Sequence, residues 1–371
     1  MMTAVTKVHV SSRAQRGTYS TEVRSRHNRS LAALGMTGAL LAACAGTPSP
    51  ARPRPRAPAP DRPIAIISAL ADDSMQGRRT ATPGALRAAR YLAGRMQAYG
   101  LEPAGDSAYF QRVPFVVSAD SEGERLRLGR PAPDSLGGVM ALGINVIGLV
   151  RGSDPALSKE AVVVGAHYDH LGIGRPVDGD SVYNGADDDA SGVAAVLTAA
   201  HDLAAGPKPR RTVIFLLPTG EEQGVLGTQY YLEHAAWPLE RTVADLEVEM
   251  IGRPDSLAGG PGRLWLTGYE RSTLGEQLSS AGLPVVADPR PDQSFFLRSD
   301  NIVFALRGIP AHTLSSYNMH RDYHQPSDEV GAVDAEHLER AAAVVSRAVR
   351  LLADGDPPRW HPGGQPTSLG P

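Results

Sequence analysis

Two hydrophobic patterns alternate along this chain: short β-branched runs and longer segments in which apolar residues recur with a helical period. The run from Ala161 to Ala166 (AVVVGA) is apolar and bounded by polar sequence, which is typical of a buried strand. Ser191 then stands where a helix N-cap is expected. The helical pattern behind it consists of Val193, Val196, Leu197, Ala200, Leu203 and Ala204.

The same patterns extend over the rest of the chain and predict an α/β fold. Because strands alternate with helices, we expect a single domain with a mostly parallel, mixed central sheet and helices on both faces. Further strands are predicted over Tyr109–Val117, Glu124–Leu128, Asn145–Val150, Thr212–Leu217, Val243–Met250, Leu264–Thr267, Val285–Ala287, Ile302–Leu306 and Ala311–Leu314. Further helices are predicted around Ile67, from Leu86 to Met96, and over Gly227–His234, Tyr269–Ala281 and Asp334–Leu352.

The N-terminal region has a different pattern. Three arginines precede the apolar stretch Leu31–Ala43, which is too short to span a bilayer and has the layout of a secretory signal. Its end, Leu41-Ala42-Ala43-Cys44, resembles the lipobox of bacterial lipoproteins, in which the cysteine is lipidated and becomes the first mature residue. We therefore expect an exported protein, held to the bacterial cell envelope by a lipid on Cys44. An ordinary secretory signal with an incidental cysteine is the alternative.

These boundaries divide the chain into four parts. Residues 1–43 are the predicted lipoprotein signal peptide, and residues 44–63 form a tether in which Pro recurs at nearly every second position. Residues 64–354 carry the folded domain, and residues 355–371, rich in Pro and Gly, are expected to be a flexible tail.

The amino-acid composition argues against several classes of function and of binding site. The 371 residues are 42% hydrophobic, as in ordinary globular proteins. Of the 37 Lys and Arg, 10 lie before Ile64, against 2 of the 40 Asp and Glu, so the folded part is acidic and a poor candidate for binding nucleic acid. A single cysteine excludes an intrachain disulfide framework and a Cys-rich zinc site. The sequence does not reveal the oligomeric state.

Polar residues recur where the predicted strands end, and the carboxyl ends of sheet strands are where α/β proteins place ligands. Imidazole and carboxylate together suit Zn²⁺ or a similar divalent ion, and two His with several carboxylates could hold two ions. For the triple Asp alone, a solvated acidic loop is the alternative. The residues are His167 and Asp169, Asp187-Asp188-Asp189, Glu221 and Glu222, Glu249 and His324.

Six motifs resemble, in order, those of the M28 family of zinc metallopeptidases, the co-catalytic aminopeptidase group. They are HYDHLG, NGADDDASGVA, PTGEEQGVLGTQYY, EMIGRP, SDNIVFALRGIP and DYHQPSDEV, and the resemblance covers roughly Ile64 to Asp354.

The resemblance implies two zinc ions bridged by Asp187, with His167 and Glu249 on one ion and Glu222 and His324 on the other. It implies that Glu221 is the general base. Asp169 would orient His167, and Asp188 would share a cis peptide bond with the bridging Asp.

Two residues depart from the family pattern. Glu249 stands where many members carry Asp, and Glu247, two residues earlier on the same face, is an alternative ligand. Asn301 replaces the His of an SDH motif, which concerns substrate contacts more than metal binding. His170 belongs to the first motif and is expected to pack or hydrogen-bond beside the site.

The resulting expectation is a zinc-dependent exopeptidase acting on peptides, most simply an aminopeptidase that hydrolyses the N-terminal peptide bond. A carboxypeptidase and a glutaminyl cyclase of the same fold are alternatives, and a surface protein that binds metal or peptide without catalysis is another.

Overall fold

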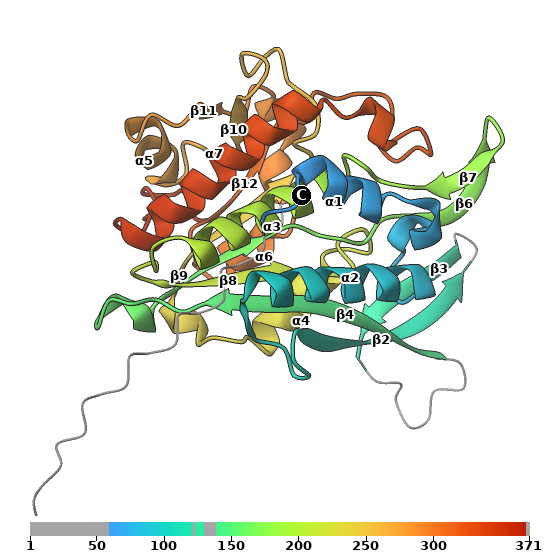
Figure 1. Cartoon of the computed structure of the whole chain (residues 1–371), viewed down its shortest axis with the longest axis horizontal. Helices are drawn as coiled ribbons and strands as arrows, with labels where there is room; N and C mark the ends of the chain where they lie inside the picture. Colours follow the sequence, from blue (N-terminus) through green and yellow to red (C-terminus); the bar gives the residue numbers. More distant parts are fainter. Residues whose placement is uncertain (1–58, 121–122, 130–138, 369–371) are drawn as a thin grey trace, which may run out of the picture. The chain divides into compact units, whose positions relative to one another are not determined.

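The fold is known from a computed structural model, which describes residues 59–120, 123–129 and 139–368 (Figure 1). The predicted signal peptide, Cys44 and most of the predicted tether lie outside the described residues. A ten-stranded mixed sheet forms the centre of the fold, in the order β11-β10-β12-β9-β5-β8-β4-β2-β3, with β1 paired to β4.

The middle of the sheet is parallel and its flanks are mostly antiparallel. Strands β12, β9, β5 and β8 run parallel to one another, whereas β10 pairs antiparallel with β12, and β4, β2 and β3 pair antiparallel on the other side. Every residue of β5 and β8 is buried, as expected for parallel strands covered on both faces. The strand bounds are β1 Glu102–Pro103, β2 Phe110–Asp120, β3 Gly123–Leu128, β4 Val139–Val150, β5 Ala161–Gly165, β8 Thr212–Leu217, β9 Thr242–Glu249, β10 Leu264–Leu266, β11 Val285–Ala287 and β12 Ala311–Ser315.

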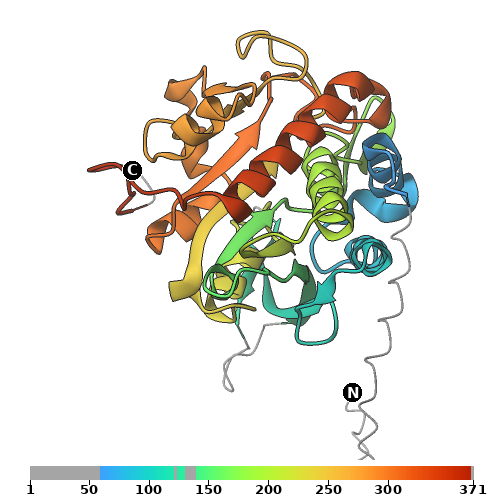
Figure 2. The ribbon, with the colours of Figure 1, turned by 60° about the vertical axis from the view of Figure 1, so that its left-hand side comes forward.

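Helices cover both faces of the sheet, and alternate strand residues pack against each layer. Val162 and Val164 of β5 join the core formed with α1, α2, α3 and α7, while Val163 joins the core formed with α4 and α6. Figure 2 shows α3 and α7 side by side across the first face. The bounds are α1 Pro63–Leu70, α2 Pro83–Tyr99, α3 Ala190–Ala205, α4 Leu226–Glu233, α5 Leu274–Ser280, α6 Asn301–Leu306 and α7 Ala335–Asp354.

Three local predictions differ from the structure. The run Ile302–Leu306, predicted as a strand, lies in helix α6, because a short apolar run fits a buried helix as well as a buried strand. The helix predicted over Tyr269–Ala281 begins only at Leu274. A two-stranded hairpin, β6 (Gly172–Val177) and β7 (Asp180–Tyr183), was not predicted; most of its residues are at least partly exposed, so it has no strong apolar pattern.

The C-terminal segment predicted to be flexible is packed on the domain over residues 355–368. The indole nitrogen of Trp360 donates to the carbonyl of Gly308 at 2.9 Å, and its ring contacts those of Phe296 and His312. The backbone amide of Arg359 donates to the hydroxyl of Thr273 at 3.0 Å. One large aromatic side chain thus anchors a stretch whose Pro and Gly content suggested a loose tail.

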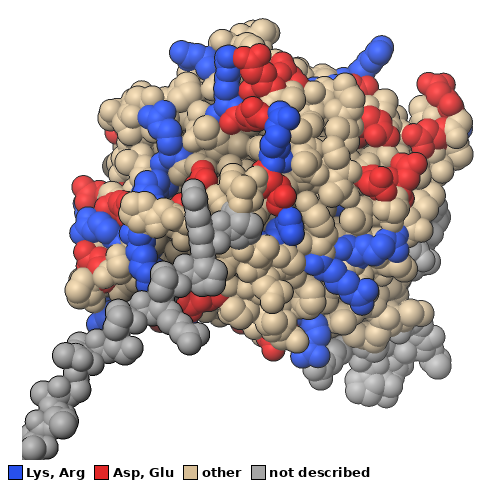
Figure 3. Space-filling view, in the orientation of Figure 1, with Lys and Arg blue, Asp and Glu red and all other residues tan. Residues whose placement is uncertain are grey.

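The surface carries mixed charge on the face seen in Figure 3, where basic and acidic side chains are interspersed. Within the described ranges, no helix combines the length and the apolar character needed to cross a bilayer.

Candidate metal centre

The predicted site residues meet at the carboxyl ends of the central strands. His167 follows β5 by two residues, Glu249 is the last residue of β9, and Glu221 and Glu222 lie just beyond β8. His324 is in the loop between β12 and α7. Because the parallel strands all end at this edge of the sheet, segments separated by more than 150 residues contribute to one site.

Two groups of possible metal ligands share the carboxylate of Asp188. His167, Asp188 and Glu249 offer ligand atoms within 4.8 Å of one another, and so do His170, Asp188 and Glu222. Nε2 of His167 lies 3.3 Å from Oδ1 of Asp188, and Nε2 of His324 lies 3.2 Å from its Oδ2. His324 also lies 3.2 Å from Oε2 of Glu222. One carboxylate therefore lies between two sets of ligands, as a bridge between two ions requires.

The carboxylate between the two ligand groups is that of Asp188 and not that of Asp187, to which the resemblance had assigned the bridging position. Oδ1 of Asp187 accepts hydrogen bonds from the amide of Gly252 at 2.7 Å and the hydroxyl of Ser191 at 3.0 Å. Its Oδ2 lies 3.0 Å from Nε2 of His320. All of these contacts turn the Asp187 carboxylate away from the two ligand groups. The cis peptide bond accordingly joins Asp188 to Asp189, one residue later than expected.

The carboxylates of Asp328 and Asp189 hold the backbone around Asp188. Asp328, which is fully buried, accepts the amide protons of Asp187 and Asp188 at 3.0 Å each. Asp189 is the N-cap of α3, where it accepts from the amide of Gly192, and it also accepts from the amide of Met250 at 2.9 Å. These bonds fix which of the three consecutive aspartates faces the site.

A buried arginine fastens the same loop from behind. Arg78 is fully buried, and its guanidinium donates to the carbonyl oxygens of Asn184 at 2.5 Å and Gly185 at 2.9 Å. Burial lowers the pKa of Arg78, whereas the charges of Asp188 and Asp328 act against that shift. A cation is thus placed under a loop that carries three aspartates, where an unpaired charge would be costly.

The two histidines that face Asp188 set its charge state. Burial raises the pKa of the Asp188 carboxyl, but the close contacts with His167 and His324 outweigh this and hold the pKa well below its usual value. Burial lowers the pKa of His324, but the contacts with Asp188 and Glu222 have the larger effect and raise it to about 10. The site is therefore rich in negative charge, which attracts cations. The same attraction favours the binding of a proton to the imidazole ring.

The residues fit divalent metal ions. Nε2 of His167 is buried and has no hydrogen-bond partner among the described residues. A buried imidazole nitrogen without a partner is costly unless it coordinates something. Imidazole nitrogens with shared carboxylate oxygens form the set that zinc prefers in catalytic sites.

Glu221 lies beside these ligands without belonging to either group. Burial raises the pKa of its carboxyl well above the usual value; His167 opposes the shift, and Glu249 and Glu222 add to it. Its backbone amide donates to Oδ1 of Asp169 at 3.2 Å, and the hydroxyl of Thr80 donates to Oδ2 of Asp169 at 2.7 Å.

Asp169 therefore positions Glu221 as well as His167. Nδ1 of His167 lies 3.2 Å from the backbone oxygen of Asp169 and 3.9 Å from its carboxylate. The closer contact with His167 is thus made by the main chain, while the carboxylate holds the turn that carries Glu221.

Of the two glutamates near the end of β9, Glu249 and not Glu247 belongs to a ligand group. Glu249 belongs to the His167 group, and burial is the main cause that raises its pKa, to about 7. Glu247 is paired with Gly165 in the sheet and lies two residues before Glu249, the last residue of β9. The longer side chain at the family's Asp position therefore still reaches the ligand group.

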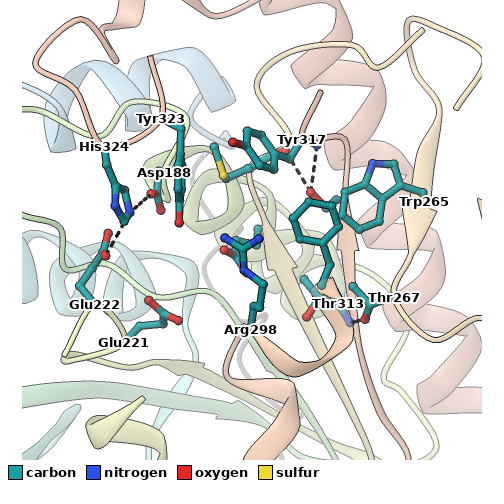
Figure 4. A pocket seen from close by; sticks show the side chains of 14 residues that line it. Asp188, Glu221, Glu222, Trp265, Thr267, Arg298, Thr313, Tyr317, Tyr323 and His324 are labelled. Carbon is teal, nitrogen blue, oxygen red and sulfur yellow. Dashed lines mark hydrogen bonds and ion pairs between the residues drawn. The ribbon is translucent and has the colours of Figure 1, made fainter. Parts of the chain in front are cut away.

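A pocket opens beside the ligand groups (Figure 4). At one end lie Asp188, Glu221, Glu222 and His324, and at the other lie aromatic side chains. Tyr323 stacks on His324 with ring centroids 3.9 Å apart. The remaining lining residues are Glu249, Met250, Trp265, Thr267, Phe295, Arg298, Thr313, Ser315 and Tyr317.

Comparison with known proteins identifies the family. The pattern of peptidase family M28 matches residues 145–349, more than half of the chain and the whole region that carries the site. The chain belongs to peptidase family M28. Within this M28 protein, the match includes every ligand-group residue described above.

Individual relatives are distant. The chain is 30% identical over 172 residues to a probable leucine aminopeptidase 2 of Aspergillus oryzae, covering 45% of this chain and 32% of that protein. It is 26% identical over 277 residues to the probable lipoprotein aminopeptidase LpqL of Mycobacterium tuberculosis, covering 65% of this chain and 52% of that protein. This M28 chain therefore spans about a third to a half of the length of these relatives.

Solved structures share the fold. An aminopeptidase from Aneurinibacillus sp. strain AM-1 has a TM-score of 0.57 at 18% identity, over 80% of this chain and 94% of that one. A glutaminyl cyclase from Bacteroides thetaiotaomicron has a TM-score of 0.53 at 16% identity, over 78% and 97% of the two chains. The M28 fold is thus common to enzymes of different activity.

Two site residues, Asp188 and Asp328, were missed or misplaced by the sequence-based prediction. Asp188 could not be told from Asp187 by composition, because both lie in one run of aspartates. His170 was expected to lie beside the site, and it does contact Glu222 at 2.8 Å. Asp328 lies in the DYHQPSDEV motif, four residues after His324, and that proximity was its only signal in the sequence.

Proposed function

We propose that this M28 protein is a zinc-dependent aminopeptidase that hydrolyses the N-terminal peptide bond of a peptide. His167, Asp188 and Glu249 would hold one zinc ion, and Asp188, Glu222 and His324 the other. His170 would orient Glu222 through the contact between Nδ1 and Oε1. The single observation that carries the proposal is the shared carboxylate of Asp188 between two groups of ligands, with the unshared Glu221 beside them.

Each residue then has a defined task. Bound zinc would lower the pKa of water and polarise the scissile carbonyl. Glu221, which belongs to neither ligand group, accepts the proton of the attacking water and delivers it to the leaving amine. Asp169 keeps Glu221 in place through its backbone amide. The aromatic end of the pocket receives the side chain of the first residue of the peptide.

The test is a pair of adjacent substitutions. Glu221→Gln should lower kcat on an aminoacyl-anilide by roughly 10²- to 10⁴-fold, the usual contribution of a general base, while bound zinc stays near two ions per chain. Glu222→Gln, one residue along, should lose zinc instead. An inactive wild-type protein with two ions bound would support the binding protein and refute the enzyme.

Free and N-acetylated dipeptides separate the exopeptidase alternatives. An aminopeptidase cleaves the free dipeptide and spares the acetylated one, since acetylation removes the α-amine. A carboxypeptidase would cleave the acetylated peptide, and a cyclase would convert an N-terminal glutaminyl peptide without hydrolysing it.

We also propose that the chain is a lipoprotein of the bacterial envelope, on the strength of the basic, apolar and Leu41-Ala42-Ala43-Cys44 sequence and of the lipoprotein name carried by the mycobacterial relative. Detergent-phase partitioning should recover the wild type with lipids, and Cys44→Ser should move to the aqueous phase. Membrane retention of Cys44→Ser would refute the lipid anchor.

A further inference from the structure

One cation in the pocket has no role in the proposed chemistry. Among the described residues that line the pocket, Arg298 is the only Lys or Arg, and its side chain is exposed. All other charged lining residues are proposed ligands of the metal ions or, in the case of Glu221, the general base. Figure 4 shows the Arg298 side chain rising between the carboxylate end of the pocket and the aromatic end.

The guanidinium is placed by aromatic packing rather than by an ion pair. Its central carbon lies 5.1 Å from the ring centroid of Phe295. Phe295 in turn stacks on Trp265, with centroids 5.2 Å apart and an interplanar angle of 29°, and meets Tyr317 edge-on at 5.8 Å. A buried aromatic stack thus supports the cation and limits its freedom.

Within the described part of the chain, no carboxylate lies within ion-pair distance of the Arg298 guanidinium, and no hydrogen bond to it is found. Its charge nevertheless acts across the pocket. Burial raises the pKa of Tyr317, and the positive charge of Arg298 opposes the shift. The five donors of this guanidinium face a cavity that a substrate must enter.

We propose that Arg298 binds a carboxylate of the substrate, so that the preferred substrates are peptides with a negative charge close to the bond that is cut. This inference rests on the proposed peptidase function. Guanidinium and carboxylate match in a bidentate geometry, and a rigid arginine loses little entropy on binding. The carboxylate has two possible sources: the C-terminal carboxylate of a dipeptide, or an acidic side chain.

Two matched substrate pairs distinguish the sources. Leu-Leu is compared with Leu-Leu-amide, and Glu-anilide with Gln-anilide, by kcat/KM on the zinc-loaded full chain. Wild type should prefer the charged member of one pair by about 10- to 100-fold, and higher salt should reduce the preference. Arg298→Ala should abolish the preference by slowing the charged substrate alone, and Arg298→Lys should restore part of it. Arg307→Ala removes an equally exposed arginine outside the pocket and should leave the preference unchanged.

A binding measurement separates this inference from the proposed function. Glu221→Gln should bind the same peptides without cutting them, and calorimetry should show the same preference for the charged member, lost on adding Arg298→Ala. Carboxylate-dependent binding without hydrolysis by wild type would keep the inference and refute the peptidase. Hydrolysis at equal rates for both members of both pairs, or a preference that survives Arg298→Ala, would overturn the inference.

Discussion

At the scale of single residues, the contacts of a carboxylate decide its role more than its place in a motif does. Asp187 and Asp188 are adjacent and chemically identical, yet Asp187 is held by Gly252 and Ser191, whereas Asp188 faces His167 and His324. Gly252 allows this approach, since a Cβ there would lie 2.8 Å from Oδ1 of Asp187.

The two aspartates should therefore respond differently to the same change. We expect Asp188→Asn to lose both zinc ions, because the charge shared by the two ligand groups is removed. We expect Asp187→Asn to keep about two ions and to lower the free energy of unfolding by about 1–3 kcal/mol, as for lost hydrogen bonds to a charged group. Metal analysis of the purified variants and urea unfolding measure the two effects. If Asp187→Asn lost zinc and Asp188→Asn kept it, Asp187 would be the bridging residue, as predicted from the sequence.

Four of the five proposed ligand residues, including His324 more than 150 residues after His167, were predicted from sequence because strand ends carry a recognisable pattern. The bridging Asp could not, because orientation within the run depends on the hydrogen bond that the Asp188 amide donates to Asp328 and on the one that Asp189 accepts from the Met250 amide, which the local sequence does not encode.

At the scale of elements, the loop between β12 and α7 has two roles. It carries the proposed ligand His324, and it supports the loop that contains Asp187, Asp188 and Asp189. Asp328 accepts the amides of Asp187 and Asp188, and Arg253 contacts it at 3.3 Å while also binding Asp322 at 2.6 Å. The loop therefore holds the bridging residue through its backbone as well as supplying a side chain to the site.

Replacing this support should weaken metal binding without removing a ligand. We expect Asp328→Asn to lower zinc affinity by about 10- to 100-fold, the effect of losing an outer partner of a metal ligand, with excess zinc restoring turnover. Competition with a chelator measures the affinity. Asp322→Asn, which keeps the amide contacts, is the control, and equal affinities for the two variants would refute the role of Asp328.

A second element-level contact predicts a pH dependence. Burial is the main cause that lowers the pKa of His312 on β12, to about 4; its Nδ1 donates to the carbonyl of Thr267 and its Nε2 lies 2.7 Å from the hydroxyl of Ser272. Because the unfolded chain binds this proton near pH 6.5 and the folded chain does not, stability falls as pH drops from about 6.5 to about 4, by roughly 3 kcal/mol.

Urea unfolding in chelator, so that metal release does not contribute, checks this prediction. The difference in unfolding free energy between wild type and His312→Gln should shrink as pH falls through that window. His234→Gln, which removes an exposed histidine, serves as the control. A difference that is constant from pH 7 to pH 4 would contradict a neutral, buried His312.

At the scale of the whole molecule, the sequence predicts the mixed sheet, its helical layers and the edge where the site lies. The central strands can be predicted from the sequence because they are short and wholly apolar. The misassigned Ile302–Leu306 is equally apolar, and only its packing, with Phe304 against Tyr231, distinguishes it as a helix. The exposed β6–β7 hairpin and the docking of Trp360 depend on contacts that no local pattern reports.

The site joins the ends of β5, β8 and β9 to the loops before α3 and α7, so metal should stabilise the whole domain. Without cations, Asp188, Glu222 and Glu249 lie close together in a buried region, where like charges repel. An ion that binds only the folded chain adds about 4 kcal/mol when its free concentration is a thousandfold above Kd. We therefore expect chelation to lower Tm and zinc to restore it, as scanning calorimetry would show. Glu221→Gln should keep this shift because Glu221 is not a ligand, and Asp188→Asn should lose it. A wild-type Tm that is the same with chelator and with zinc would show that these carboxylates do not hold a metal in the folded protein.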